Sequence, residues 1–141
     1  MNQDEIKKIL PHRDAMLLVE EAYLNEDGSS TAYYTVKGDE FFLQGHFPGY
    51  PVVPGVILCE MAAQSSCVMF KDDMGGVKPF YTGINNVKFR SQVQPGDKIM
   101  FHCVITRIKK PFYFVKGEAY VGDKLCMQGE FSFALVPETA G

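Results

Sequence analysis

The sequence predicts an α+β fold in which one antiparallel β-sheet wraps around a single helix. Six β-rich runs fall into two groups, with two before the only long helical window and four after it. Such segregation is typical of α+β proteins, whereas βαβ units alternate strands with helices. The helical window, Val56–Lys71, carries apolar residues on nearly every side, which indicates a buried helix. A single curved sheet leaves an edge and a face open, so we also expect at least a dimer.

Local signals place the other elements. A short helix is expected over Asp4–Leu10, where Pro11 stops it. The turn signal Asn25–Gly28 joins two strands, Ala15–Leu24 and Ser30–Lys37, into a predicted hairpin. The four later strands are expected over Phe80–Arg90, Lys98–Lys109, Pro111–Val121 and Lys124–Val136. The last run alternates apolar and polar residues, which indicates one buried and one exposed face.

Length and composition fit one domain over residues 1–141, with 46% hydrophobic residues. A net charge of −3 gives no electrostatic case for nucleic-acid binding. The N-terminus lacks the apolar region of a signal peptide, and no window holds the roughly 20 apolar residues of a membrane span. We therefore expect a cytoplasmic protein that makes no membrane contact. The cysteines show no metal-binding spacing and the three histidines lie far apart, so we expect buried, reduced thiols and no metal.

Glu60 is the most unusual residue of the chain, because it interrupts the apolar run of the predicted helix. Burial of a carboxyl group raises its pKa, as a general acid near neutral pH requires. The alternative is a glutamate at the helix edge that reaches solvent. Gln64 follows one turn later on the same face, where it could hydrogen-bond Glu60 or a polar group of a ligand, or only satisfy a buried backbone carbonyl.

His46 lies in the loop before the helix, between Gly45 and the run Phe47–Pro48–Gly49. Prolines at positions 48, 51 and 54 restrict the backbone of this loop, so it holds its side chains at low entropic cost. A lone histidine is more often structural than catalytic. Here its place beside a helix that carries Glu60 favours an acid–base role.

Pro54 and Gly55 begin the predicted helix. Proline suits the first turn, where its missing N–H leaves no bond unmade. Gly55 presents no side chain to a ligand that approaches its backbone N–H at the positive end of the helix dipole. This arrangement indicates a site for a carbonyl oxygen that gains negative charge, although an ordinary helix start explains the spacing equally well.

At these residues the sequence resembles the FabZ-type β-hydroxyacyl-acyl-carrier-protein dehydratases. The resemblance is carried by His46-Phe47-Pro48-Gly49-Tyr50-Pro51-Val52-Val53-Pro54-Gly55-Val56, followed by Glu60 and Ala63-Gln64. Further similar segments are Ile9–Arg13, Leu17–Glu20, Lys88–Arg90 and Pro95–Asp97. The chain departs from the family pattern at Asp14–Met16 and at Asn85–Asn86.

The resemblance implies a hot-dog fold, with the sheet around one long central helix, and a double hot-dog dimer, commonly assembled as a trimer of dimers. It implies that His46 of one subunit and Glu60 of the other act on (3R)-hydroxyacyl chains held on acyl carrier protein, with the Gly55 amide at the thioester carbonyl. Glu60 stands where the related FabA-type dehydratase–isomerases usually carry Asp, which favours dehydration alone. No cofactor is required.

In this scheme His46, neutral near pH 7, removes the α-proton, and protonated Glu60 donates to the departing hydroxyl. We expect Phe47, Val56 and Phe89 to line the acyl site beside Gln64, with Met61 and Met69 as further candidates. The alternative for each of them is that it simply belongs to the core. A basic patch for the acidic carrier protein is expected among Lys88, Arg90, Arg107, Lys109 and Lys110; the alternative is that they only form a solvated surface.

Three other functions remain open. A hot-dog thioesterase would hydrolyse the same thioester bond and release a free thiol. An enoyl-CoA hydratase would differ in its carrier. A non-catalytic acyl-thioester sensor would bind the ligand without turnover.

Overall fold

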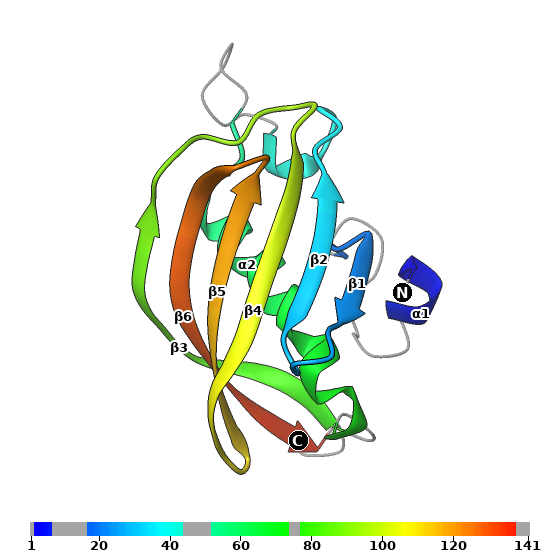
Figure 1. Cartoon of the computed structure of the whole chain (residues 1–141), viewed down its shortest axis with the longest axis vertical. Coiled ribbons are helices and arrows are strands. Elements are labelled where there is room, and N and C mark those ends of the chain that lie inside the picture. The colour runs from blue at the N-terminus through cyan, green and yellow to red at the C-terminus, as the bar shows by residue number, and fades with distance from the viewer. Residues whose placement is uncertain (1, 7–16, 44–51, 74–76, 138–141) are drawn as a thin grey trace.

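One six-stranded antiparallel sheet curves around helix α2, as Figure 1 shows for the computed structural model of the chain. The structure describes residues 2–6, 17–43, 52–73 and 77–137. The strands are β1 (Glu21–Leu24), β2 (Ser30–Thr35), β3 (Val77–Phe89), β4 (Lys98–Lys109), β5 (Phe112–Val121) and β6 (Lys124–Pro137). The helices are α1 (Gln3–Ile6) and α2 (Gly55–Ser66), with 3₁₀ turns η2 (Phe41–Leu43) and η3 (Cys67–Asp73). The predicted α+β class is therefore confirmed.

The strands follow the order β1-β2-β4-β5-β6-β3, and every neighbouring pair is antiparallel. The β5–β6 hairpin turns at Gly122, whose φ of 59° lies in the left-handed region that glycine adopts without strain. Strand β4 spans the predicted range, and each of β3, β5 and β6 ends within three residues of its prediction. Strands β1 and β3 form the two edges of the sheet.

The first strand is shorter than the predicted Ala15–Leu24. Strand β1 begins at Glu21, although Leu17, Leu18 and Val19 are already buried. The N–H of Leu18 donates to Gln64 Oε1 at 2.8 Å, and this long-range bond takes the donor that a sheet ladder would use.

Helix α1 begins one residue before the predicted Asp4. Asn2 Oδ1 accepts from the Glu5 N–H at 2.9 Å, and Glu5 Oε1 accepts from the Asn2 N–H at 3.3 Å. This reciprocal arrangement is a capping box, with asparagine in the capping position, and it fixes the start of the helix. The predicted end, residues 7–10, lies outside the described residues.

Helix α2 is also shorter than the predicted helix over Val56–Lys71. The α-helix ends at Ser66 and continues as the 3₁₀ segment η3, in which Phe70 has φ −123° and ψ 31°. At this end, Ser65 Oγ donates to the Met61 carbonyl and Ser66 Oγ to the Ala63 carbonyl, each at 2.7 Å. Serine hydroxyls that bond to carbonyls three or four residues back weaken and bend a helix, which accounts for its early end.

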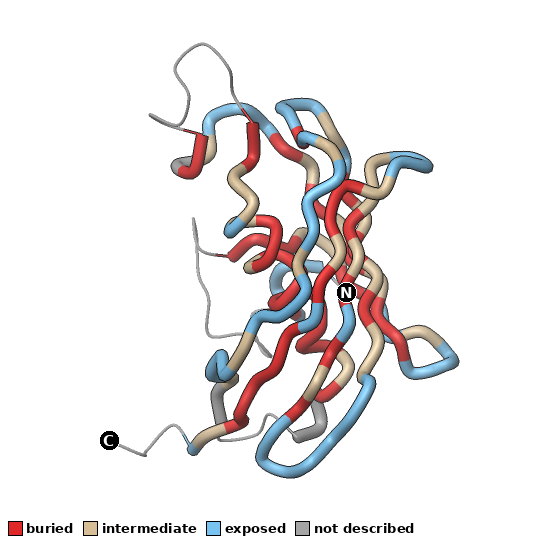
Figure 2. The backbone as a smooth tube through the Cα atoms, turned by 90° about the vertical axis from the view of Figure 1, so that its left-hand side faces the viewer, coloured by how far each residue is buried: buried red, intermediate tan, exposed pale blue. Residues whose placement is uncertain are grey.

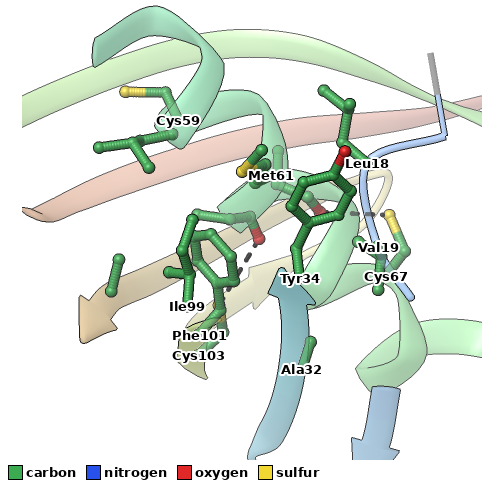
Figure 3. Close-up of a cluster of buried hydrophobic side chains, with 14 of the residues drawn as sticks. Leu18, Val19, Ala32, Tyr34, Cys59, Met61, Cys67, Ile99, Phe101 and Cys103 are labelled. Atoms are coloured by element: carbon green, nitrogen blue, oxygen red, sulfur yellow. Dashed lines mark hydrogen bonds between the residues drawn. The ribbon is translucent and has the colours of Figure 1, made fainter. Parts of the chain in front are cut away.

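The core lies between α2 and the concave face of the sheet, as the buried residues in Figure 2 and the cluster in Figure 3 show. Met61 and Ala62 of α2 and Phe101 of β4 have no exposed surface. Helix and sheet approach closely at Gly117 of β5, because a Cβ there would lie 3.6 Å from the Ala62 methyl group and 3.2 Å from the Phe131 ring.

All four cysteines are buried and free, as predicted: Cys59, Cys67, Cys103 and Cys126. Burial raises the pKa of the Cys103 thiol to about 12, so this group is protonated and behaves as an apolar side chain.

Candidate active site

Glu60 lies on the second turn of α2, where both carboxylate oxygens accept hydrogen bonds. Gln64 Nε2 donates to Oε1 and the Tyr81 hydroxyl donates to Oε2, each at 3.1 Å. The side chain is half-buried, and Val56, one turn earlier on the same face, is 76% exposed. The expectation of a helix buried on every side is therefore wrong for this face, which opens toward the edge strand β3.

Gln64 connects this carboxylate to the backbone of the N-terminal segment. Its side chain is 3% exposed, and its Oε1 accepts from the Leu18 N–H at 2.8 Å. Because the carbonyl oxygen is committed to Leu18, the amide nitrogen faces Glu60 as a donor. Gln64 therefore bonds to Glu60, one of its predicted partners, and to a buried backbone group at the same time. The backbone group is an N–H, where the sequence suggested a carbonyl.

Tyr81 of β3 is the site residue that sequence reasoning missed. Its ring packs on the cross-strand partner Phe133, with centroids 5.2 Å apart, and its hydroxyl also lies 3.4 Å from the Cys59 carbonyl oxygen. Burial, followed by the nearby charge of Glu60, raises the pKa of Tyr81 far above its ordinary value, so the phenol is protonated. The only signal in the sequence is that a tyrosine hydroxyl in a packed strand requires a polar partner.

A small pocket adjoins the carboxylate. It has a volume of about 170 Å³ and lies between α2, the start of η3 and strands β3 and β6. Its lining residues are Glu60, Ala63, Gln64, Cys67, Pro79, Tyr81 and Phe133. The pocket therefore combines apolar walls with one carboxylate, one amide and one phenol.

A larger pocket, of about 670 Å³, lies at the start of α2. It contains three of the predicted site residues, Gly55, Val56 and Phe89, together with residues 52–54, Leu58 and residues 90–92. A hydrogen bond of 2.8 Å from the Val53 N–H to the Val93 carbonyl fixes the chain as it enters the helix. The first N–H groups of any helix lack intrahelical acceptors, so this end of α2 presents donors to the pocket region.

Gly55 is required here for a reason that the sequence did not indicate. A Cβ at this position would lie 2.6 to 3.0 Å from three atoms of the Phe89 ring, so only glycine permits this packing. Glu60 follows Gly55 by five residues, about 7.5 Å along the helix axis. The two predicted groups thus lie on one helix but line two different pockets of the isolated chain.

The remaining candidates divide into three groups. His46 and Phe47 lie outside the described residues, so their placement stays a prediction. Met61 is fully buried in the core, and the alternative interpretation of this residue is confirmed. Met69 is half-buried and packs against the core.

The basic residues expected to form one patch lie at two ends of the sheet. The Arg90 N–H donates to the Cys126 carbonyl at the start of β6, and Arg90 lines the larger pocket. Lys109 pairs with Phe112, which pairs with Ala134 near the end of β6. Positions 126 and 134 are about 26 Å apart along a strand. A single patch is therefore excluded, and Arg90 is the candidate beside the larger pocket.

Within the described ranges, no group of three or more histidine, cysteine or acidic side chains is arranged to hold a metal ion. A helix long and apolar enough to cross a membrane is likewise not found among the residues that the structure describes.

Comparison with known proteins identifies the family. Residues 10–130 match the model of the FabA-like domain. The chain is 40% identical over 137 residues to the 3-hydroxyacyl-[acyl-carrier-protein] dehydratase FabZ of Clostridium perfringens, covering 96% of this chain and 99% of the relative. It is 43% identical over 136 residues to the FabZ dehydratase of Macrococcus caseolyticus, covering 94% of each.

Solved structures share the fold at lower identity. The dehydratase heterocomplex ApeI:P from Xenorhabdus doucetiae superposes with a TM-score of 0.78 at 19% identity, covering 95% of this chain and 92% of that one. The HP0420 homologue from Helicobacter felis gives a TM-score of 0.69 at 18% identity, covering 92% and 98%. With the family model matching most of the chain and relatives at 40% identity matching nearly all of it, the chain belongs to the FabA-like domain family.

Proposed function

We propose that this chain dehydrates (3R)-hydroxyacyl-[acyl-carrier-protein] to the trans-2-enoyl product in type II fatty acid biosynthesis. The observation that carries this proposal is the 40% identity, over 96% of the chain, to relatives named as that dehydratase. The carboxylate that Gln64 and Tyr81 hold at the pocket beside α2 supports it, because elimination of water requires a positioned proton donor.

Glu60 is the general acid of the proposed reaction and His46 the base. His46 takes the α-proton, the bond from the β-carbon to oxygen breaks, and the hydroxyl leaves with the proton of Glu60 as water. The C–H electron pair becomes the new carbon–carbon double bond, and the C–O pair becomes the new O–H bond of water. The O–H pair of Glu60 stays on its carboxylate. The proton on His46 must return to Glu60 before the next turnover. The thioester carbonyl gains negative charge as the α-proton leaves, and the Gly55 N–H at the start of α2 is placed to stabilise it.

A dimer would complete the site. Strand β3 is an edge of the sheet and pairs only with β6 among the described strands. The strand carries three large exposed apolar side chains, Phe80, Ile84 and Phe89, and Val56 of α2 is exposed as well. An unpaired edge rich in apolar groups favours pairing with a second copy of the chain. We infer that two copies join along β3 into a double hot-dog, so that His46 of one copy serves Glu60 of the other, and that three dimers form the hexamer.

The substrate carrier is acyl carrier protein, and the site of action is the cytoplasm. The larger pocket has apolar walls formed by Val52, Val53, Val56, Leu58 and Phe89, which suit an acyl chain and its pantetheine arm. Arg90 at its rim supplies a positive charge for an acidic carrier.

The test follows the enoyl-thioester absorbance after the protein is added to an (R)-3-hydroxyacyl thioester. We expect turnover by the unchanged chain and its loss in His46→Ala and Glu60→Gln. The matched controls, His102→Ala on β4 and Glu118→Gln on β5, should retain activity, because both residues lie outside the two pockets.

Each competing function gives a different outcome in the same assay. Release of a free thiol, detected with a thiol reagent, would show that the protein is a thioesterase and not a dehydratase. A clear preference for coenzyme A over the carrier protein would indicate a hydratase. Binding of the thioester without any turnover would indicate an acyl-thioester sensor. Activity that survives in Glu60→Gln or His46→Ala would remove that residue from the mechanism.

A further inference from the structure

The two oxygens of Glu60 have partners of different chemical character. Oε1 faces the Gln64 amide nitrogen, which donates hydrogen bonds and cannot accept them. The Leu18 N–H occupies the other end of that amide and prevents it from turning over. Oε2 faces the Tyr81 hydroxyl, which both donates and accepts. A proton on Oε1 would point at an N–H donor, so the stable position for the acidic proton is Oε2.

Tyr81 has a second acceptor that allows its hydroxyl to turn. The hydroxyl oxygen lies 3.1 Å from Glu60 Oε2 and 3.4 Å from the Cys59 carbonyl oxygen. When Glu60 is ionised, the Tyr81 proton points at Oε2. When Glu60 carries its proton on Oε2, that proton can be donated to the Tyr81 oxygen, while the phenol proton points at the Cys59 carbonyl. A rotation about one C–O bond thus satisfies Glu60 in both protonation states.

The surroundings keep this arrangement in place. The Tyr81 ring packs on Phe133, so the oxygen has little freedom to move away from Glu60. The thiols of Cys59 on α2 and Cys67 on η3 also interact with Glu60. Burial raises the pKa of both thiols and of Tyr81, so all three groups are neutral near pH 7.

We propose that Tyr81 is a positioning residue for the dehydration, which keeps the acidic proton on Glu60 Oε2 and stabilises the carboxylate that forms as that proton leaves. The inference rests on the proposed role of Glu60 as the general acid. The hydroxyl supplies its donor hydrogen bond only as negative charge develops on Oε2, so its effect falls on the transition state and on the product side of proton transfer.

The decisive variant is Tyr81→Phe, which keeps the ring on Phe133 and removes only the hydroxyl. Tyr120→Phe is its matched control, because the Tyr120 hydroxyl also donates to a carboxylate, Glu118 Oε2, at 3.1 Å, away from both pockets. We expect kcat to fall about tenfold in Tyr81→Phe with KM within about twofold, since hydrogen bonds to charged groups are typically worth that much in rate. Tyr120→Phe should match the unchanged chain.

The pH profile separates positioning from packing. A general acid must be protonated, so kcat/KM falls as pH rises through the titration of Glu60. Removal of a donor that favours the ionised form moves that basic limb to higher pH in Tyr81→Phe. A role in ring packing alone would leave the limb in place. If both kcat and the limb of Tyr81→Phe equal those of Tyr120→Phe, the positioning role is overturned while the dehydratase function stands.

A measurement on the unchanged chain needs neither turnover nor a variant that folds. With ¹³C-labelled tyrosine and glutamate, the Tyr81 Cζ resonance should shift with the same midpoint as the Glu60 carboxyl resonance, because the hydroxyl turns as Glu60 titrates. A Tyr81 resonance that stays fixed through the Glu60 midpoint would contradict the proposal. If the chain shows no dehydration at all, the proposed function fails, and this titration still decides whether Tyr81 follows Glu60.

Discussion

Two tyrosine–glutamate hydrogen bonds in this chain have the same length and opposite settings. Tyr81 donates to Glu60 at 3.1 Å and joins strand β3 to helix α2, 21 residues apart in sequence. Tyr120 donates to Glu118 at 3.1 Å along one strand, on the face of β5 that points away from α2. The first pair lies in a pocket beside an amide and an apolar wall, whereas the second lies outside both pockets. The length of such a hydrogen bond alone therefore does not determine its effect on the carboxylate, because that effect depends on solvent and on neighbouring donors.

The largest expected difference between the two pairs is catalytic. Glu60→Gln should lower kcat/KM by a factor of about 10² to 10⁴, the range that a general acid supplies, while Glu118→Gln should stay within about twofold. Enoyl-thioester absorbance measures both variants. Equal activities would show that the pair in the pocket has no special role.

Gln64, beside the pair in the pocket, should matter for stability as well as activity. Gln64→Leu leaves the buried Leu18 N–H without its acceptor and should lower the free energy of unfolding by about 1 to 3 kcal/mol. Gln128→Leu, next to Glu118 on the neighbouring strand, should change that free energy by less than about 0.5 kcal/mol, because Gln128 is half-exposed. Urea unfolding measures both free energies. Similar decreases in the two variants would show that Gln64 and Gln128 do not differ in their contribution to stability.

The contact between the start of α2 and Phe89 provides a third comparison. Gly55→Ala forces the new methyl group into the Phe89 ring and should cost about 1 to 3 kcal/mol. The double variant Gly55→Ala with Phe89→Leu should recover part of that loss, since the smaller side chain can move aside. A double-mutant cycle in urea checks this coupling. Additive losses would mean that Phe89 does not hold the start of the helix that carries Glu60.

The smallest expected difference appears at alkaline pH. The folded state raises the pKa of Tyr81, so the unfolded chain loses its phenol proton first and stability falls as pH rises above about 10. One such group contributes a slope of at most about 1.4 kcal/mol per pH unit, lowered here because Tyr81 is 36% exposed, and Tyr81→Phe should remove it. The pKa of Tyr120 is raised too, but by less than that of Tyr81, so its pH window is narrow and Tyr120→Phe should change the slope less. Unfolding free energies measured between about pH 10 and 12 test the order.

The sequence predicted the elements that depend on local signals. Both ends of strand β4 are predicted correctly, because they depend on local signals: the alternation of side chains and the turn at Pro95–Gly96. The predicted helix extends beyond the observed end of α2. The bonds from Ser65 and Ser66 to carbonyls of the preceding turn end the helix, and the pattern of apolar residues does not indicate such bonds. The predicted first strand is longer than β1, because the Leu18 N–H bonds to a glutamine 46 residues away, and a local pattern does not indicate such a partner.

The candidate site divides in the same way. Glu60 stood out because one carboxylate interrupts an apolar helix, a local contrast that the sequence displays. Its partner Tyr81 depends on how β3 pairs with β6 and packs on α2, which only the tertiary structure fixes. The role of His46 stays a prediction carried by the family pattern.

The bond from Leu18 to Gln64 makes a backbone amide that is distant in sequence from Glu60 a reporter on the support of Glu60. Gln64 can hold Glu60 only while its oxygen remains attached to the Leu18 N–H. Any opening that releases Glu60 on this side also exposes that amide to water, so its hydrogen-exchange rate reads the fraction of time in which the acid is unsupported. Substitutions or fusions that loosen residues 17–19 would then lower activity without touching a residue of either pocket.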